Sequence, residues 1–205
     1  MHVCSFKEKS FLNGDVYIGN FKGELCHGNG KYTWSDGTIY EGDWVDGQMT
    51  GKEIMKWVNS CVFDGCWSNG LKHGHGVYRY VNGDVYRGNW ENGKIDGKGI
   101  MNWVDGDVFD GCWSNRLKDG YGVYRYANGD VHTGHWKKGG NDGKGIMRWA
   151  NGVVFDGCWS NGLRHGYGVC RFTNGDVHSG HWKKGEKDGK GIKRWAGGDV
   201  FDGCW

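Results

Sequence analysis

Residues 109–131 read Phe-Asp-Gly-Cys-Trp-Ser-Asn-Arg-Leu-Lys-Asp-Gly-Tyr-Gly-Val-Tyr-Arg-Tyr-Ala-Asn-Gly-Asp-Val, and this stretch decides the fold. From Phe109 to Trp113 the apolar and polar positions alternate with a period of two, which is typical of strands. A polar segment follows, and a second alternating run extends from Gly122 to Tyr126. Asn128-Gly129 then supplies the signal of a tight turn. The stretch therefore predicts one β-hairpin.

This hairpin is one unit of a 23-residue repeat. Eight complete units begin at residues 17, 40, 63, 86, 109, 132, 155 and 178, and a ninth begins at 201. Because the period holds without insertion or deletion, we expect the hairpins to line up side by side. The predicted fold is all-β, an elongated, curved, single-layer antiparallel sheet of tandem 23-residue hairpins. Residues 1–10 are expected to form an N-terminal extension, and residues 11–205 the repeat array.

Large aromatic residues lead most units and recur four positions later, on the same face of the strand. We expect them to form a core stripe that includes Tyr40, Trp44, Trp67, Tyr86, Trp90, Trp113, Trp136, Trp159 and Trp182. We predict a register in which Trp113 lies opposite Gly122 and Phe109 lies opposite Tyr126. A glycine opposite each indole would leave room for its ring.

The same register predicts ion pairs on the other face of the sheet. The pairs would be Glu41–Lys56, Asp64–Arg79, Asp110–Arg125 and Asp156–Arg171. Cross-strand pairs of opposite charge contribute roughly 0.2–1 kcal/mol each. The basic members of these pairs, together with Arg148 and Arg194, occupy the same position of the unit and form a ladder of cations. Binding of anionic lipid by this ladder is the alternative to the ion pairs.

Composition narrows the class of protein. The chain has 205 residues, of which 41 are Gly and none is Pro, and it carries 13 Trp, 10 Tyr and 8 Phe. So much Gly argues against a helical protein, and so many rings argue against a disordered one. The 26 Lys and Arg nearly balance the 24 Asp and Glu, so we expect no nucleic-acid partner. No run of 18 apolar residues occurs and residues 1–10 lack the apolar core of a signal peptide, so we expect a cytoplasmic protein.

Motifs that carry chemistry are absent from the sequence. Cys66, Cys112, Cys158 and Cys204 recur every 46 residues, which places them four strands, roughly 19 Å, apart, too far for disulfides. His132-x-x-His135 would point its two rings to opposite faces of a strand. Neither a P-loop nor the set of protein-kinase motifs is present. We therefore expect no metal, no cofactor, no catalytic residue and no enzyme activity.

The unit, aromatic-x-Gly-x-Trp followed by Gly, Gly-x-Gly and Asn/Asp-Gly, resembles the MORN (membrane occupation and recognition nexus) repeat from Phe11 to Trp205. Departures from the pattern occur at Glu53, Ser60, Arg116, His132 and His178. Residues 27–37 and 106–111 resemble the N-terminal MORN array of plant phosphatidylinositol-4-phosphate 5-kinases. This resemblance implies a module that associates with acidic phospholipids and protein partners, and whose kinase domain would lie outside this chain.

Basic residues are concentrated near the C-terminus. Residues 132–205 carry 12 Lys and Arg against 7 Asp and Glu. The candidate lipid-binding residues are Lys137, Lys138, Lys183, Lys184, Lys187, Lys190, Lys193 and Arg194. They predict weak, salt-sensitive binding to phosphatidic acid or phosphoinositides, and a peripheral location at the plasma membrane. The alternative is a protein scaffold or a dimerisation module with no lipid role, in which an aromatic groove docks a partner, or the unpaired edge at residues 201–205 associates with itself.

Overall fold

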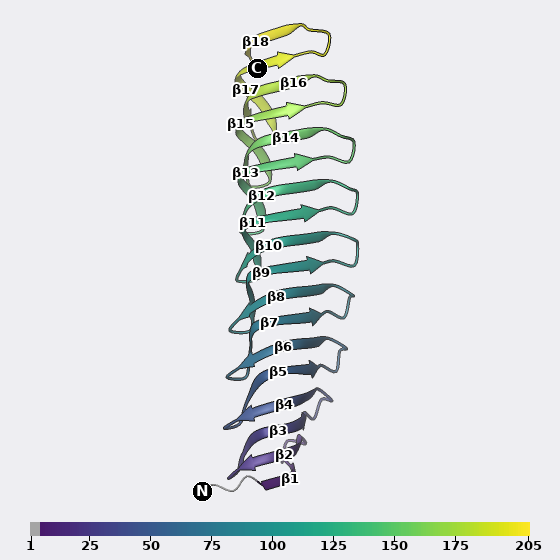
Figure 1. Ribbon diagram of the computed structural model, residues 1–205, viewed down its shortest axis with the longest axis vertical. Helices are drawn as coiled ribbons and strands as arrows, with labels where there is room; N and C mark the ends of the chain where they lie inside the picture. The colour runs from purple at the N-terminus through teal and green to yellow at the C-terminus, as the bar shows by residue number, and fades with distance from the viewer. Residues whose placement is uncertain (1–4) are drawn as a thin grey trace. The chain divides into compact units, whose positions relative to one another are not determined.

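The computed structural model describes residues 5–205, and every regular element in that range is a strand (Figure 1). The chain divides into two units, residues 1–104 and 105–205. Within each unit, every strand pairs antiparallel with the strand that follows it along the chain. The prediction of an all-β fold made of tandem antiparallel hairpins is confirmed. The described residues include no helix long and apolar enough to cross a membrane.

Unit 1 holds nine strands. They are β1 (Ser5–Ser10), β2 (Val16–Lys22), β3 (Leu25–Thr33), β4 (Ile39–Val45), β5 (Gln48–Lys56), β6 (Val62–Ser68), β7 (Leu71–Arg79), β8 (Val85–Glu91) and β9 (Lys94–Asn102). Strand β1 pairs with β2 and lies within the segment expected as an N-terminal extension, whose residues 1–4 lie outside the described residues.

Unit 2 also holds nine strands. They are β10 (Val108–Ser114), β11 (Leu117–Arg125), β12 (Val131–Lys137), β13 (Gly140–Arg148), β14 (Val154–Ser160), β15 (Leu163–Arg171), β16 (Val177–Lys183), β17 (Glu186–Arg194) and β18 (Val200–Cys204).

Two kinds of connection alternate along each unit. A tight turn joins β10 to β11, and its central residues Asn115 and Arg116 both have positive φ, 48° and 72°, as a type I′ turn requires. A longer loop joins β11 to β12, where the N–H of Tyr126 donates to the carbonyl of Asp130 (2.9 Å). Gly129 in that loop has a φ of 92°. The tight turn fixes the register of each hairpin.

The observed register differs from the predicted one. Phe109 pairs with Tyr124 instead of Tyr126, and Gly111, not Trp113, lies opposite Gly122. Trp113 pairs with Lys118, after a bulge that follows Gly111. The prediction was wrong because the turn at Asn115-Arg116 holds only two residues, which brings the two strands together sooner than a long polar loop would.

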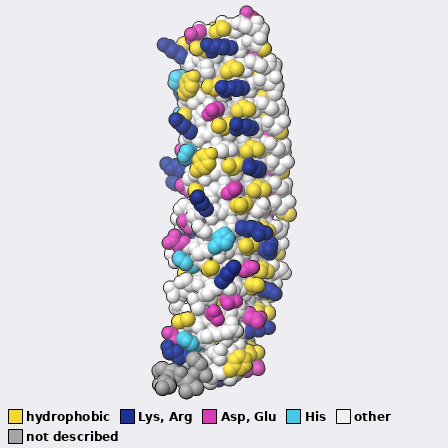
Figure 2. Space-filling model, in the orientation of Figure 1, with side chains coloured by type: hydrophobic (Ala, Val, Ile, Leu, Met, Phe, Trp, Pro, Cys, Tyr) yellow, Lys and Arg dark blue, Asp and Glu magenta, His cyan; other side chains and the backbone are white. Residues whose placement is uncertain are grey.

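The predicted ion pairs fail for the same reason. Glu41, Asp64, Asp110 and Asp156 pair with Ile54, Val77, Val123 and Val169, respectively. The basic residues Lys56, Arg79, Arg125 and Arg171 pair with Ile39, Val62, Val108 and Val154. Basic and hydrophobic side chains accordingly alternate along the visible face of unit 2 (Figure 2).

The core of each unit is a stripe of rings on one face of the sheet. The nine residues expected in the stripe are all buried. In unit 2, the Phe109 ring makes edge contacts with Trp113 (5.2 Å between ring centroids) and with Trp136 of the next hairpin (5.1 Å). The Trp136 indole N–H donates to the carbonyl of Gly122 (3.3 Å). Because these rings are buried against the sheet, the aromatic stripe offers little surface for the docking groove considered above.

Candidate functional site

Four lysines of the predicted basic site lie in two tight turns at one edge of unit 2. This edge is the side of the sheet where the tight turns join the ends of the strands, and it is not an unpaired strand. Lys137 and Lys138 lie where β12 turns into β13, and Lys183 and Lys184 lie where β16 turns into β17. Lys138 and Lys184 have positive φ, 49° and 51°, because each occupies the first central position of a type I′ turn. All four side chains are exposed. These four residues are called the turn lysines below.

The other four predicted residues lie elsewhere in unit 2. Lys187 and Lys193 lie on the aromatic face, with the Lys187 ammonium 4.0 Å from the centroid of the Trp205 ring. Burial lowers the pKa of Lys187. Lys193 is 3.4 Å from the carboxylate of Asp176. The exposed residues Lys190 and Arg194 project from the opposite face of β17. The structure therefore brings only the turn lysines to a common edge.

Each pair of turn lysines has a carboxylate nearby, but one carboxylate does not cancel the charge of two lysines. The Lys183 ammonium is 3.8 Å from the Asp188 carboxylate. The backbone N–H of Lys138 donates to Asp119 (3.3 Å). A hollow of about 430 Å³ beside the first pair is lined by Asp119, Gly120, His135, Trp136, Lys137, Asp142, Gly143 and Lys144. This hollow is lined by both acidic and basic side chains. The lysine turns are therefore more basic than the hollow.

The corresponding turns of unit 1 carry acidic residues. Asp46 occupies the place of Lys138 in the turn between β4 and β5, and Glu91 occupies the place of Lys137 at the end of β8. The Lys22 ammonium is 3.1 Å from the Asp46 carboxylate, and this contact lowers the pKa of Asp46. Glu91 also pairs with Lys94 across its turn, and Lys183 pairs with Glu186 across the second lysine turn. Both turns of unit 2 therefore keep a net positive charge, and the two corresponding turns of unit 1 do not.

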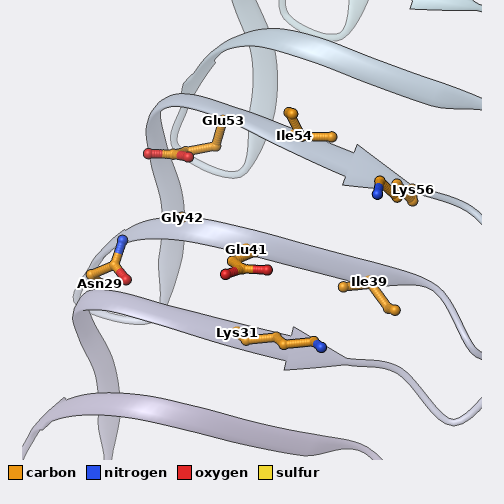
Figure 3. A pocket seen from close by; sticks show the side chains of 8 residues that line it. All are labelled: Asn29, Lys31, Ile39, Glu41, Gly42, Glu53, Ile54 and Lys56. Carbon is orange, nitrogen blue, oxygen red and sulfur yellow. The ribbon is translucent and has the colours of Figure 1, made fainter.

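A second hollow, of about 410 Å³, lies in unit 1 across strands β3, β4 and β5 (Figure 3). It is lined by Asn29, Lys31, Ile39, Glu41, Gly42, Glu53, Ile54 and Lys56. Glu53 replaces the glycine that other repeats place here, and the pairing of β4 with β5 becomes irregular between Glu41 and Asp43. Burial raises the pKa of Glu53, and the nearby carboxylates of Asp43 and Glu41 raise it further.

Metal-ligand geometry is not found within residues 5–205, where no group of three His, Cys, Asp or Glu side chains could hold an ion. The cysteines at 26, 61, 66, 112, 158, 170 and 204 are free thiols.

A family model shows what kind of repeat this geometry represents. The MORN repeat model matches residues 17–39, 40–62, 63–85, 86–108, 109–131, 132–154, 155–177 and 178–200. The chain belongs to the MORN repeat family.

Parts of this MORN array are similar to curated proteins. Phosphatidylinositol 4-phosphate 5-kinase 1 of Oryza sativa subsp. japonica is 42% identical over 60 residues, which are 28% of this chain and 8% of the kinase. MORN repeat-containing protein 3 of Xenopus laevis is 46% identical over 41 residues, 20% of this chain and 17% of that protein. The predicted resemblance to plant phosphatidylinositol-4-phosphate 5-kinases is confirmed, and the match spans only a small part of the kinase.

A solved structure with a similar fold is the wild-type TCP10 domain of Danio rerio CPAP in complex with a peptide of Danio rerio STIL. It has a TM-score of 0.50 and 11% identity, and the match covers 98% of this chain and all of that domain. At this level of identity the similarity concerns the fold alone.

Sequence reasoning missed cations that lie against the rings on the aromatic face of each unit of the MORN array. The Lys72 ammonium lies 4.4 Å from the centroid of the Tyr78 ring, that of Lys118 lies 4.3 Å from Tyr124, and the Arg164 guanidinium lies 4.1 Å from Trp182. Burial lowers the pKa of Lys118 to about 8. These three residues recur every 46 positions, a signal visible in the sequence. Their contacts cover the rings, so we assign them a packing role.

Proposed function

We propose that this MORN array is a non-catalytic module that binds membranes containing acidic phospholipids. The observation that carries the proposal is the placement of the turn lysines, two exposed pairs at one edge of unit 2. A cation near an anionic membrane surface contributes about 1 kcal/mol, and salt screens that attraction beyond about 8–10 Å. Four such cations support weak, reversible association that falls as the salt concentration rises.

Phosphatidic acid and phosphoinositides are the proposed ligands, and the cytoplasmic surface of the plasma membrane the proposed location. The similarity to phosphatidylinositol 4-phosphate 5-kinases supports this choice, because a phosphoinositide appears in the name of those enzymes. Unit 1 is not proposed to take part, since its corresponding turns hold Asp46 and Glu91.

Co-sedimentation of the full chain with vesicles tests the proposal. We expect binding at low salt to phosphatidylcholine vesicles that contain phosphatidic acid or phosphatidylinositol 4-phosphate, and no binding to phosphatidylcholine alone. Lys183→Glu combined with Lys184→Glu should abolish most of the binding. The matched control combines Lys52→Glu with Lys98→Glu, two exposed lysines on strands of unit 1 that give the same change in net charge. An equal loss of vesicle binding in both variants would contradict the proposal that the turn lysines form the lipid-binding site.

The absence of catalysis is part of the same proposal. Supplied with phosphatidylinositol 4-phosphate and ATP, the full chain is expected to transfer no phosphate. Phosphorylated product above the no-protein background would contradict it.

A protein-interaction scaffold is the second candidate function. It is favoured by the similar fold of the TCP10 domain, which was solved with a bound peptide. In this array the partner would contact the exposed face of the sheet opposite the rings. The partner would be another protein or a second copy of the chain. Failure to bind any anionic vesicle, together with a molecular mass that rises with concentration in light scattering, would favour self-association over lipid binding.

A further inference from the structure

Apolar side chains share the edge of unit 2 with the turn lysines. Leu117 begins β11 and Leu163 begins β15, each directly after a tight turn. Their exposed fractions are 48% and 50%. An exposed leucine by itself is ordinary. What distinguishes these two is that each lies beside a turn that carries a lysine pair.

Backbone hydrogen bonds fix that neighbourhood. The N–H of Gly139, in the first lysine turn, donates to the carbonyl of Lys118 (2.9 Å). The N–H of Gly185, in the second lysine turn, donates to the carbonyl of Arg164 (3.0 Å). Because Leu117 precedes Lys118 and Leu163 precedes Arg164, the backbone of each leucine lies beside one lysine turn. The Leu163 side chain comes closest, since a Cβ added to Gly185 would be 3.9 Å from its Cδ2.

The edge carries a further cation in a strained backbone. Arg116 has a φ of 72° at a turn position that is Gly in six other hairpins, residues 47, 70, 93, 139, 162 and 185. A left-handed conformation is unfavourable for a residue with a Cβ. Strain of this kind concentrates at functional sites. Arg116 places its charge directly before Leu117, so it repeats the combination of cation and leucine seen at the lysine turns.

We infer that this edge, formed by Arg116, Leu117, the turn lysines and Leu163, inserts into the interface of an anionic bilayer. The inference rests on the proposed lipid-binding function and adds a mode of contact. The two leucines enter the boundary between headgroups and acyl chains, and the cations lie at the level of the lipid phosphates. This is how amphipathic surfaces combine apolar burial with charge attraction at membranes. The sheet therefore meets the membrane by its turns, and its aromatic core stays buried.

Unit 1 provides a control built on the same backbone. Leu25 and Leu71 occupy the same position in their hairpins, with exposed fractions of 50% and 48%. Leu25 lies next to the turn that contains Asp46. Leu71 lies next to the turn that directly follows Glu91. Their exposure is equal and neither neighbouring turn has a net positive charge, so they are not expected to enter an anionic membrane.

The test compares two double variants of the full chain, Leu117→Ser with Leu163→Ser, and Leu25→Ser with Leu71→Ser. Circular dichroism and thermal unfolding first establish that both fold like the wild type. Binding to vesicles of phosphatidylcholine with phosphatidic acid is then measured at low and at high salt. Because burial of half a leucine side chain corresponds to roughly a tenfold change in partition, we expect losses of tenfold or more for the unit 2 variant. We expect no loss for the unit 1 variant.

A lipid monolayer provides a second measurement, because insertion raises its surface pressure whereas adsorption of charge alone does not. Wild type and the Leu25→Ser, Leu71→Ser variant should raise the pressure, and the Leu117→Ser, Leu163→Ser variant should not.

Two results separate this inference from the proposed function. If the unit 2 leucine variant binds like wild type while reversal of Lys183 and Lys184 abolishes binding, insertion is wrong and electrostatic lipid binding stands. If wild type binds no anionic vesicle, both proposals fail. Equal losses in the two leucine variants would also overturn insertion at this edge.

Discussion

The ring of Phe109 lies against Gly122 on the neighbouring strand, so closely that a Cβ added to Gly122 would be 2.5 Å from the Cζ of the ring. Gly111 lies directly opposite Gly122, and a Cβ there would meet the Cα of Gly122 at 2.6 Å. The buried ring of Phe109 thus occupies space that two missing side chains create.

This contact predicts that Gly122→Ala destabilises the array. The added methyl group meets backbone and a ring held between two Trp residues, so neither neighbour can move away cheaply. Overpacking of this kind costs about 1–3 kcal/mol. Urea unfolding followed by tryptophan fluorescence measures the change. Gly140→Ala is the control, because a Cβ at Gly140 meets nothing closer than 3.9 Å, and its midpoint should stay close to that of wild type.

The glycines also show what could be predicted from the sequence. Strict recurrence of Gly and rings every 23 residues sufficed to predict the hairpins, the buried stripe and the need for Gly beneath a ring. It did not identify which ring lies over which glycine, because that depends on the two-residue turn at Asn115-Arg116 and on the bulge after Gly111. Asn-Gly occurs both at the tight turns, as in Asn161-Gly162, and in the longer loops, as in Asn128-Gly129, so this dipeptide does not distinguish the two connections.

The candidate site was predictable in charge but not in arrangement. Eight basic residues were expected to act together, and the alternation of strand faces separates Lys187 and Lys193 from Lys190 and Arg194. The position of Leu117 and Leu163 beside the lysine turns follows from the hairpin register, for which the prediction was wrong.

Replacing Arg116 with Gly should raise stability and lower membrane affinity. Arg116 has a φ of 72° and Ser60 a φ of 68°, both at places where other repeats have Gly. Relief of left-handed strain is offset in part by the greater freedom of Gly in the unfolded chain, which leaves a gain of about 0.5–1 kcal/mol for Arg116→Gly and for Ser60→Gly. Thermal unfolding measures this gain.

Vesicle binding separates the two substitutions. Arg116→Gly removes a cation from the edge and should weaken binding at low salt by about 1 kcal/mol, whereas Ser60→Gly should leave it unchanged. Unchanged binding for Arg116→Gly would exclude Arg116 from the contact and leave the role of the turn lysines intact.

Glu53→Gly should make the pairing of β4 with β5 regular and stabilise the array. Glu53 takes the place of a glycine, and a Cβ at Gly42 would collide with its side chain. Burial and the nearby carboxylates of Asp43 and Glu41 raise the pKa of Glu53, so its ionised form is disfavoured in the folded protein. We expect Glu53→Gly to stabilise the array by roughly 1 kcal/mol at neutral pH. The gain should shrink as the pH falls and Glu53 becomes protonated, and unfolding midpoints at several pH values measure it. Glu53→Gln, which removes the charge and keeps the side chain, separates the charge from the steric contribution.

Two buried histidines predict a loss of stability in mild acid. His132 and His178 are wholly buried, and neither ring nitrogen of either residue has a hydrogen-bond partner among the described residues. Burial lowers the pKa of each to about 4, with a further contribution from Lys118 at His132 and from Lys187 and Lys193 at His178. Between the ordinary value of 6.5 and about 4, the unfolded chain therefore binds protons that the folded chain does not. The free energy of unfolding should fall as the pH drops through this window, by up to about 1.4 kcal/mol per pH unit for each histidine.

Phenylalanine at these two positions removes this pH dependence, because other units already place Phe63, Phe109 and Phe155 there. We expect His132→Phe combined with His178→Phe to stabilise the protein at neutral pH by about 1–3 kcal/mol, since it removes buried polar atoms that lack partners. Relative to wild type, the gain should grow as the pH falls from about 7 to about 4. Unfolding in urea at pH 7, 6 and 5 measures both effects. A constant difference between variant and wild type across that range would show that the two imidazoles are charged in the folded state or that they become accessible to water. The stripe of rings would then be open enough to admit solvent, and the burial on which the edge-on mode of membrane contact depends would have to be revised.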